Sequence, residues 1–422
     1  MKIVALLLFI LMYVLMIAYS KKRHYIALMT AFIFVILGIL PYNKVLTSID
    51  LNVLLMMSGT MILVYYFIES KMPALIADFL LDRAPNVMWV TIFMSAFAGI
   101  ISAFIDNTAT VLMIAPVGIA ICKKLRKNPV PMILALAISS NLQGAATLVG
   151  DATSIMLGAY ADLDFMDFFF LHGKPSIFFS VELGAVVSLF VLMFMFRREK
   201  KKIDVSKDVR VKNYIPTILL IALVLSLIII SFIPYQNELA NGLICTSFAI
   251  LSLLFDANHN KKENKIVKNL RELDYQTLLL LTGVFLVIGG IKHVGIIDDI
   301  ANILLNFGGE NVFLLYTLIV FGSSIISIFI DNIPYVATML PVIGAITFKL
   351  GISPYLFYFG LLCGATLGGN LTPIGASANI TAVGLLRKEG YHVSFMDFFK
   401  IGFPLTLSAL LTGYLFIWLV WH

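Results

Sequence analysis

Residues 102–117 read SAFIDNTATVLMIAPV, and residues 327–342 read SIFIDNIPYVATMLPV. The two stretches align without a gap at an offset of 225 residues, and eight of the sixteen aligned positions are identical. Each places an Asp-Asn pair inside a run that is apolar enough to lie in lipid. Because an ionisable side chain at membrane depth is costly without a partner, such a group indicates a functional site. The repeated pair therefore predicts a buried polar site built from two copies of one motif.

The composition of the whole chain is that of a membrane protein. Of its 422 residues, 60% are hydrophobic and 13% are charged, and the mean hydropathy is +0.98. Soluble globular proteins lie far from these values. A bilayer core requires about 20 apolar residues for each helical span. Ten segments can supply such spans: 1–20, 25–41, 51–68, 132–159, 175–196, 214–233, 241–255, 274–291, 354–386 and 401–421.

The net charge of +6 comes from basic residues beside the ends of these segments. Loops rich in Lys and Arg next to membrane spans remain in the cytoplasm. This pattern predicts a multi-pass protein of the plasma (inner) membrane with cytoplasmic basic loops, and no nucleic-acid partner. Twenty-five of the 30 Lys and Arg residues fall in six segments assigned to the cytoplasm: 21–24, 69–86, 122–130, 197–213, 256–273 and 387–400.

The same charges indicate that two further apolar runs turn back inside the membrane. Run 87–122 lies between two basic segments, so a complete crossing would place one of them on the wrong face. Run 310–348 is flanked by 292–309 and 349–353, which are both poor in positive charge. We therefore expect two re-entrant hairpins that enter from opposite sides, with the Asp-Asn pairs near their tips. Irregular backbone at this depth is tolerated only where it is buried in protein or lines a wet cavity.

The repeat continues on both sides of the tips. NLQGAATLVGDATSI at 141–155 aligns with TLGGNLTPIGASANI at 366–380, and DLNVLLMMSG at 50–59 aligns with DYQTLLLLTG at 274–283. Each copy holds five spans and one hairpin, and an odd number of crossings inverts the second copy. Inverted repeats of this kind are typical of secondary transporters with a binding site at the bilayer midplane.

The sequence thus predicts an all-α polytopic membrane protein with about ten transmembrane helices, two re-entrant hairpins and broken helices at the midplane. The expected divisions are repeat one at 1–196, a basic cytoplasmic linker at 197–213, and repeat two at 214–422.

Small and polar residues interrupt the spans 132–159 and 354–386 near their middle. Gly frees the backbone from the helical conformation, and Pro373 removes a hydrogen bond. Broken helices expose carbonyl oxygens to cations, while the N-terminus of the next half-helix attracts anions. The alternative is that the small residues only permit tight helix packing. The tips and breaks supply the candidate binding residues: Asp106, Asn107, Thr108, Asp331, Asn332, Thr147, Gly150, Asp151, Asn370, Thr372, Gly375, Ser377 and Asn379.

The tip carboxylates suggest how transport is coupled to an ion gradient. Two buried acidic groups at one site raise each other's proton affinity and titrate as a pair. Sodium bound at Asp106, Asn107, Asp331 and Asn332 would neutralise them as a proton does, so exchange between sodium and protons is the simplest coupling. The alternative is that each Asp only caps the following helix. No cofactor beyond these coupling ions is expected, and no phosphate-binding loop appears in the sequence.

FIDNTATVLMIAPV, FIDNIPYVATMLPV and GGNLTPIGASANITAVG resemble motifs of the ion transporter superfamily, in the branch of arsenite permeases, NhaD-type sodium/proton antiporters and the melanosomal P-protein. They are more distantly similar to divalent anion/sodium symporters. The symporters carry a Ser-Asn-Thr signature at each tip, whereas this chain has Asp106-Asn107-Thr108 and Asp331-Asn332-Ile333. The added negative charge favours a cation or a neutral substrate such as arsenous acid over a dicarboxylate.

The resemblance covers nearly the whole chain, and it implies an elevator-like movement of a domain that holds both hairpins and both breaks. We therefore expect a secondary active transporter of the arsenite permease type, not an enzyme, that exports a metalloid or an anion. The alternatives are a sodium/proton antiporter and, from another class, an ion channel. The expected partners are the lipid bilayer, a small inorganic ion or metalloid, a second copy in a homodimer, and a separate ATPase subunit of the kind that some arsenite permeases use.

Overall fold

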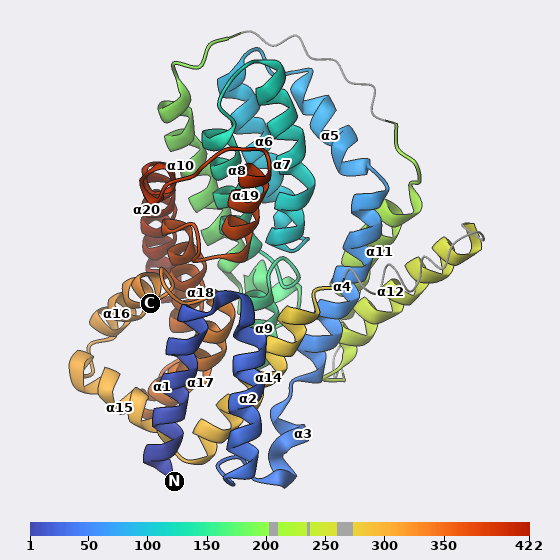
Figure 1. Cartoon of the computed structure of the whole chain (residues 1–422). Helices are drawn as coiled ribbons and strands as arrows, with labels where there is room; N and C mark the ends of the chain where they lie inside the picture. Colours follow the sequence, from blue (N-terminus) through green and yellow to red (C-terminus); the bar gives the residue numbers. More distant parts are fainter. Residues whose placement is uncertain (202–209, 234–236, 260–272) are drawn as a thin grey trace.

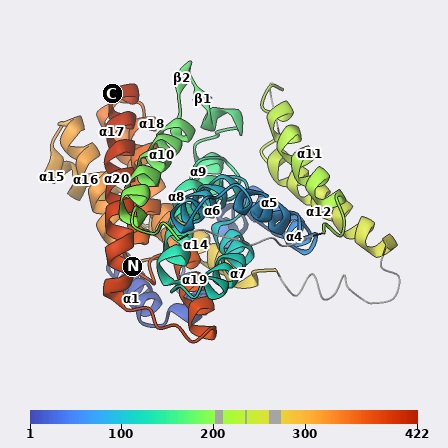
Figure 2. The same ribbon diagram turned by 90° about the horizontal axis from the view of Figure 1, so that it is seen from above.

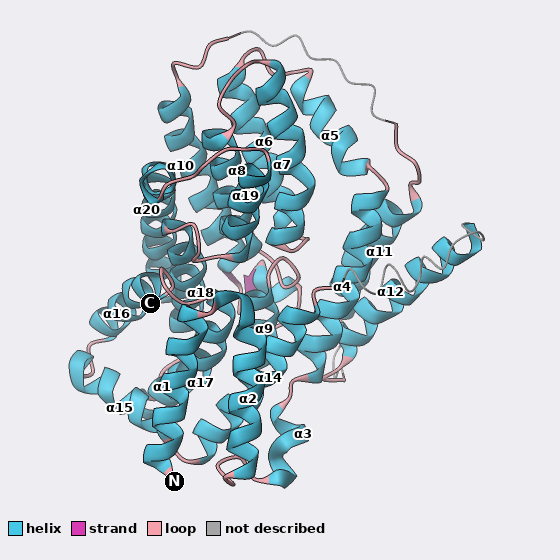
Figure 3. Cartoon of the chain, viewed as in Figure 1, coloured by secondary structure: helices cyan, strands magenta, loops and turns pink. Residues whose placement is uncertain are grey.

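The chain is almost entirely helical in the computed structural model, which describes residues 1–201, 210–233, 237–259 and 273–422 (Figure 3). One short hairpin of β1 (Phe170–Leu171) and β2 (Lys174–Pro175) interrupts the helices. The expected all-α class is confirmed. The segment 256–273 and the basic linker 197–213 lie partly outside the described residues.

The first half of the chain forms ten α-helices within its described residues. They are α1 (Lys2–Ala18), α2 (Arg23–Ile36), α3 (Val45–Ser48), α4 (Leu51–Glu69), α5 (Met72–Leu81), α6 (Val87–Ser102), α7 (Asn107–Lys124), α8 (Val130–Gly144), α9 (Ala152–Tyr160) and α10 (Ile177–Phe196). The second half contains α11 (Ile215–Ile230), α12 (Ala240–His259), α14 (Tyr275–His293), α15 (Ile296–Gly308), α16 (Val312–Ile326), α17 (Asn332–Leu350), α18 (Tyr355–Gly368), α19 (Ser377–Lys388) and α20 (Phe395–Trp421).

Within the described part of the chain, five helices are long and apolar enough to cross a membrane by length and composition: α4, α10, α14, α17 and α20. The pairs α1–α2 and α15–α16 meet the same criteria only when each pair is taken together, and they bend by 116° and 118°. Counting each pair as one span gives up to seven. Most of the other expected spans contain shorter apolar helices, so the number of ten remains a prediction.

Two segments that were expected to connect spans contain helices of their own. The segment 69–86 includes α5, and the segment 292–309 includes α15. Helix α15 carries Asp298 and Asp299 in its first turn, where they pair with Lys349 at 4.0 Å and Lys2 at 2.7 Å respectively. Its remaining positions are largely apolar. With only 13 residues, α15 is shorter than the roughly 20 residues that one span requires, so the sequence predicts a connection there.

The two halves of the chain pack into each other at a pair of repeat-related glycines. Gly59 of α4 aligns with Gly283 of α14 in the sequence repeat. A Cβ atom on Gly59 would lie 2.5 Å from the backbone of Cys245 in α12, and one on Gly283 would lie 2.7 Å from the backbone of Ala27 in α2. Helix α4 therefore packs on α12 and α14 packs on α2, so each half supplies a partner for the other (Figure 1).

The hairpin α6–α7 and helix α17 lie in different parts of the molecule. In Figure 1, α6, α7 and α8 occupy the upper part and α17 the lower part. The pairs α11–α12 and α15–α16 lie at opposite edges in both views, and α10 and α20 lie side by side between them (Figures 1 and 2). This arrangement agrees with inverted repeats, whose orientation in a membrane remains a prediction.

Replacement of Gly283 by Ala is expected to destabilise the protein, because the added methyl group would overlap the α2 backbone. We expect the loss to be about 1–3 kcal/mol, the usual cost of overpacking. The measurement is the melting temperature of the purified protein in detergent. Gly322→Ala in α16 is the matched control, since nothing lies within 4 Å of its Cβ position. Equal melting temperatures for the two variants would contradict the packing argument.

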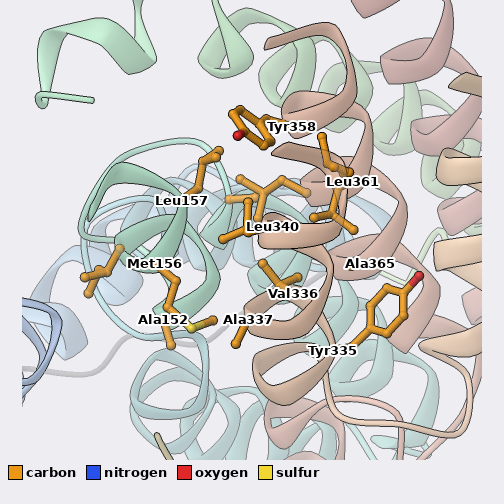
Figure 4. Close-up of a cluster of buried hydrophobic side chains, with 14 of the residues drawn as sticks. Ala152, Met156, Leu157, Tyr335, Val336, Ala337, Leu340, Tyr358, Leu361 and Ala365 are labelled. Carbon is orange, nitrogen blue, oxygen red and sulfur yellow. The ribbon is translucent and has the colours of Figure 1, made fainter. Parts of the chain in front are cut away.

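Apolar contacts join the two halves a second time, close to the broken helices. Helix α9 follows the first break and packs against α17 and α18 of the second half. Figure 4 shows Met156 and Leu157 of α9 next to Ala337 and Leu340 of α17, with Tyr358 of α18 beside them. The first break is thereby held against the helix that begins at the second tip.

Candidate functional site

The first tip lies between α6 and α7 and is organised by Asp106. Its Oδ2 atom accepts hydrogen bonds from the backbone N–H groups of Thr108 at 2.9 Å and Ala109 at 3.1 Å. Thr108 Oγ1 donates to Asn107 Oδ1 at 3.3 Å. Asp106 is half-buried, and Asn107 is buried. The capping role weighed in the sequence analysis is therefore present.

The second tip, between α16 and α17, has a different electrostatic environment. Asp331 Oδ1 accepts from the backbone N–H of Ile333 at 3.2 Å, and its Oδ2 forms an ion pair with Arg23 Nη1. Asn332 is buried, and its Oδ1 accepts from Ser327 Oγ at 2.5 Å. The charge pattern counted Arg23 among the residues of a basic loop. The structure instead places its guanidinium group against the second tip.

The first break separates α8 from α9, and Asp151 caps the helix that follows it. Asp151 Oδ1 accepts from the backbone N–H of Ala152 at 2.8 Å, and Oδ2 accepts from Thr153 Oγ1 at 2.8 Å. Asp151 is buried and interacts electrostatically with Asp106. The carboxylates of Asp106 and Asp151 therefore lie close enough to influence each other.

The second break separates α18 from α19 and contains a single turn of 3₁₀ helix, Gly369–Leu371. Asn379 crosses this break, because its Nδ2 donates to Gly369 O at 3.1 Å and to Thr372 O at 3.2 Å. Ser377 is half-buried in the first turn of α19. Both spans that were predicted to be broken are thus interrupted at the predicted residues.

Each tip is tied to the break of its own half by the same hydrogen bond. Thr147 Oγ1 donates to the carbonyl oxygen of Ala103, and Thr372 Oγ1 donates to that of Ile328 at 3.0 Å. Donor and acceptor both align at the repeat offset of 225 residues. The sequence repeat is therefore also a repeat of the local geometry that joins tip and break.

Asn141 links the first tip to the second half at the centre of the molecule. Its Oδ1 accepts from Asn107 Nδ2 at 2.8 Å, and its Nδ2 donates to Thr366 O at 2.9 Å and Asn370 Oδ1 at 3.0 Å. Asn370 Nδ2 donates in turn to Ile138 O at 3.3 Å. Asn141 was not among the candidate residues, although an Asn in the middle of an apolar span was a visible signal. It aligns with Thr366, so equivalent positions of the two halves touch here.

Backbone oxygens converge on the glycines of the two breaks. A Cβ atom on Gly150 would lie 2.5 Å from Gly144 O, 2.7 Å from Ala103 O and 2.8 Å from Ser102 O. A Cβ atom on Gly375 would lie 2.5 Å from Gly369 O and 2.9 Å from Thr372 Oγ1. Oxygen ligands of this kind suit hard cations. The two breaks are therefore packed closely at these glycines, and cation binding by their oxygens remains a prediction.

Several buried oxygen atoms near the breaks have no hydrogen-bond partner within the described residues. Ser154 Oγ and Asn379 Oδ1 are both in this group, and the two residues align in the repeat. Thr366 Oγ1, at the central contact, is a third. Because buried polar atoms are normally paired, matching unpaired oxygens in both halves are consistent with a ligand-binding role.

A cavity of about 1840 Å³ opens beside the first break, between α4, α9, α12, α14 and α17. It reaches Leu148 of the first break and Met156 of α9, and no candidate binding residue lines it. Asp50 and Glu238 lie on its wall. Burial raises the pKa of Asp50, and the carboxylates of Glu238 and Asp162 raise it further. The same wall also carries Lys44 and Lys292, so it presents charges of both signs.

The structure brings most of the candidate residues together, but in two groups. Asp106, Asn107, Thr108, Thr147, Gly150 and Asp151 surround the first tip, and Asn370 reaches them through Asn141. Asp331, Asn332, Thr372, Gly375, Ser377 and Asn379 lie at the second tip and break. In the described residues, no hydrogen bond joins Asp106 to Asp331. The meeting of the two carboxylates at one cavity remains a prediction.

An all-helical fold with two hairpins and two broken helices is an architecture typical of secondary transporters. The family model described as citrate transporter (CitMHS) matches residues 7–357, and the chain belongs to this family. An uncharacterized transporter of Mycobacterium bovis is 30% identical over 435 residues, covering 99% of this chain and 98% of the relative. The P protein of Mus musculus is 26% identical, covering 88% of this chain and 54% of the relative. The resemblance to the ion transporter superfamily is confirmed.

Two solved structures share the fold. The YdaH transporter of Alcanivorax borkumensis is 12% identical with a TM-score of 0.59, covering 89% of this chain and 87% of that chain. MtrF of Neisseria gonorrhoeae, described as an antimetabolite efflux pump, is 15% identical with a TM-score of 0.59, and the match covers 92% of this chain and 83% of that chain. The family and its relatives are transporters, so the expectation that the protein is not an enzyme is confirmed.

Proposed function

We propose that this transporter is secondary active, that a sodium or proton gradient drives it, and that it exports a small anion or a metalloid. The observation that supports this proposal most is the contact between tip and break, which occurs in both halves with a half-buried Asp at each tip. A duplicated site with acidic groups and converging carbonyl oxygens suits a coupling cation. The helix N-termini at the same tips suit an anionic or polar substrate.

The candidate residues take separate roles in this proposal. Asp106, Asn107 and Thr108 bind the coupling ion at the first tip, together with the backbone around Thr147, Gly150 and Asp151. The second tip and break contribute Asp331, Asn332, Asn370, Thr372, Gly375, Ser377 and Asn379. Sodium is held at the two Asp-Asn pairs, and protonation of the same carboxylates releases it. Competition between the two cations would couple the transport cycle to either gradient.

We further propose an elevator-like movement in which both hairpins and both broken helices travel together. The hydrogen bonds from Thr147 and Thr372 support this view, because they tie each tip to its break. The protein is proposed to work in the plasma (inner) membrane with its basic loops in the cytoplasm, as repeats at 1–196 and 214–422. A homodimer and a separate ATPase subunit remain predictions.

A sodium/proton antiporter is the second candidate, and the paired acidic tips favour it. The family is described by citrate transport, so citrate joins arsenite as a substrate to test. An ion channel is a further alternative, which would conduct without a counter-ion.

Everted membrane vesicles distinguish these functions. For the proposed exporter, we expect accumulation of arsenite or citrate that requires a sodium or proton gradient and stops when an ionophore collapses it. Collapse of a pH gradient on sodium addition, without substrate accumulation, would indicate the antiporter instead. Flux that continues without a counter-ion would indicate a channel, and vesicles from cells lacking the protein are the control.

A further inference from the structure

We propose that Arg23 is an internal cation that competes with the coupling ion for Asp331, so that the two tips have different tasks. This inference rests on the proposed function, in which the tip carboxylates bind a cation. The first tip binds the coupling ion directly. The second must exchange Arg23 for that ion, which makes Arg23 a positioning residue of the transport cycle.

Contacts of the N-terminal helices hold Arg23 in place beside the second tip. Arg23 is the first residue of α2, at the bend after α1, and its Nε donates to Ser20 O at 3.1 Å. Helix α1 contacts α17 next to this pair, since the hydroxyl of Tyr13 donates to Pro334 O at 2.9 Å. The first turn of α17 is therefore bound to the N-terminal helices both by charge and by a neutral hydrogen bond.

The corresponding position in the other half carries no charge. Arg23 lies four residues before Ala27, which contacts Gly283, and Asn241 lies four residues before Cys245, which contacts Gly59. Asn241 thus occupies in α12 the place that Arg23 occupies in α2. The segment 231–239 that precedes it, SFIPYQNEL, contains no Lys or Arg. In the described residues, Asp106 forms no ion pair.

Burial makes the Arg23–Asp331 pair an exchange site. The side chains of Arg23 and Asp331 are only 20% and 10% exposed, so neither charge is fully hydrated. Separating such a pair leaves an uncompensated charge at each side. A cation arriving at Asp331 removes that penalty for the carboxylate. The pair therefore opens readily only when a coupling ion takes the place of the guanidinium group.

Asp274 provides a second carboxylate for Arg23 after the exchange. Asp274 caps α14 by accepting from the backbone N–H of Thr277 at 3.1 Å, and it is exposed. It interacts electrostatically with Arg23. Arg23 can thus leave Asp331 and still face a negative charge, which allows the N-terminal helices to separate from the second tip.

Ion binding to the purified protein tests this inference without requiring transport. Sodium and proton titrations of thermal stability in detergent give the midpoint for each ion, because a bound ligand stabilises the folded state. Arg23→Gln is expected to lower the midpoint concentration of the coupling ion about tenfold, since the competitor is gone. Arg23→Lys keeps the positive charge and is expected to stay near wild type. Lys22→Gln, which removes an exposed charge one residue earlier, is the matched control.

The outcomes separate this inference from the proposed function. If the wild type responds to an ion and Arg23→Gln has the same midpoint, the competition is refuted while cation coupling stands. If the wild type responds to neither ion, both fail. Should Arg23→Gln not fold, the double variant Arg23→Gln/Asp331→Asn is compared with Asp331→Asn alone. Greater stability of the double variant supports the pairing, and lower or equal stability overturns it.

Discussion

Replacement of Asp106 by Asn is expected to lower ion-coupled transport by about 100-fold or more while leaving the amount of folded protein in the membrane unchanged. Asn is nearly the same size as Asp and is an equally good helix cap, so the hydrogen bonds to Thr108 and Ala109 have a substitute acceptor. What the variant lacks is the negative charge. Transport in everted vesicles, normalised to the protein present, measures the effect.

Asp397→Asn is the control for this prediction, because Asp397 also belongs to a helix cap, at the start of α20, but its side chain is exposed. The Asp397→Asn variant should transport at the wild-type rate.

Asp331→Asn should also lose transport, and in addition it should lower the melting temperature because Arg23 loses its partner. The loss of stability should be smaller than the roughly 3–5 kcal/mol seen for fully buried pairs, since this pair is partly exposed. Wild-type transport in Asp106→Asn would show that its charge has no role.

The second large effect is expected from Gly150→Ala. The added methyl group would lie within 2.5–2.8 Å of three backbone carbonyl oxygens, which belong to the first tip and to the first break. Backbone atoms cannot move away as a flexible side chain does, so the tip must shift relative to the break. Misplacement of a binding group by about 1 Å can cost about 100-fold in rate. We therefore expect transport to fall by about that factor.

Gly375→Ala should behave in the same way, since its Cβ position lies 2.5 Å from Gly369 O. Gly384→Ala in α19 is the matched control, because nothing lies within 4 Å of its Cβ position. Size-exclusion chromatography in detergent establishes whether each variant is folded before its transport is measured. A folded Gly150→Ala protein that transports normally would exclude the carbonyl cluster from the binding site.

The tips and breaks were predictable from the sequence because they combine two strong local signals. A polar pair in an apolar run is costly in lipid, and its repetition at a fixed offset shows that the pattern is not accidental. Thr147 and Thr372 were candidates at aligned positions, and the structure shows that both make the same contact with the tip of their own half. Capping by Asp106 and Asp331 followed from the same positions.

Other features depend on contacts between residues far apart in the chain. Arg23 lies next to Lys21 and Lys22, and a charge count cannot distinguish a guanidinium group that reaches Asp331 from two exposed amines. The role of Asn141 depends on Asn107 and Asn370, which come from different halves. Helix α15 was not predicted because its 13 residues are too few for a membrane span, and spans were the only helices that the sequence analysis sought.

The mutual packing of the two halves has a consequence for how the protein is made. Helices α2 and α4 are synthesised long before α14 and α12, the helices that cover Ala27 and Gly59. During translation the close-packing surfaces of the early helices therefore lack their protein partners. They gain these partners only after the later helices have inserted into the bilayer. Biogenesis of the first half thus finishes only with the second, which leaves an interval in which quality-control proteases and insertases meet an incomplete molecule.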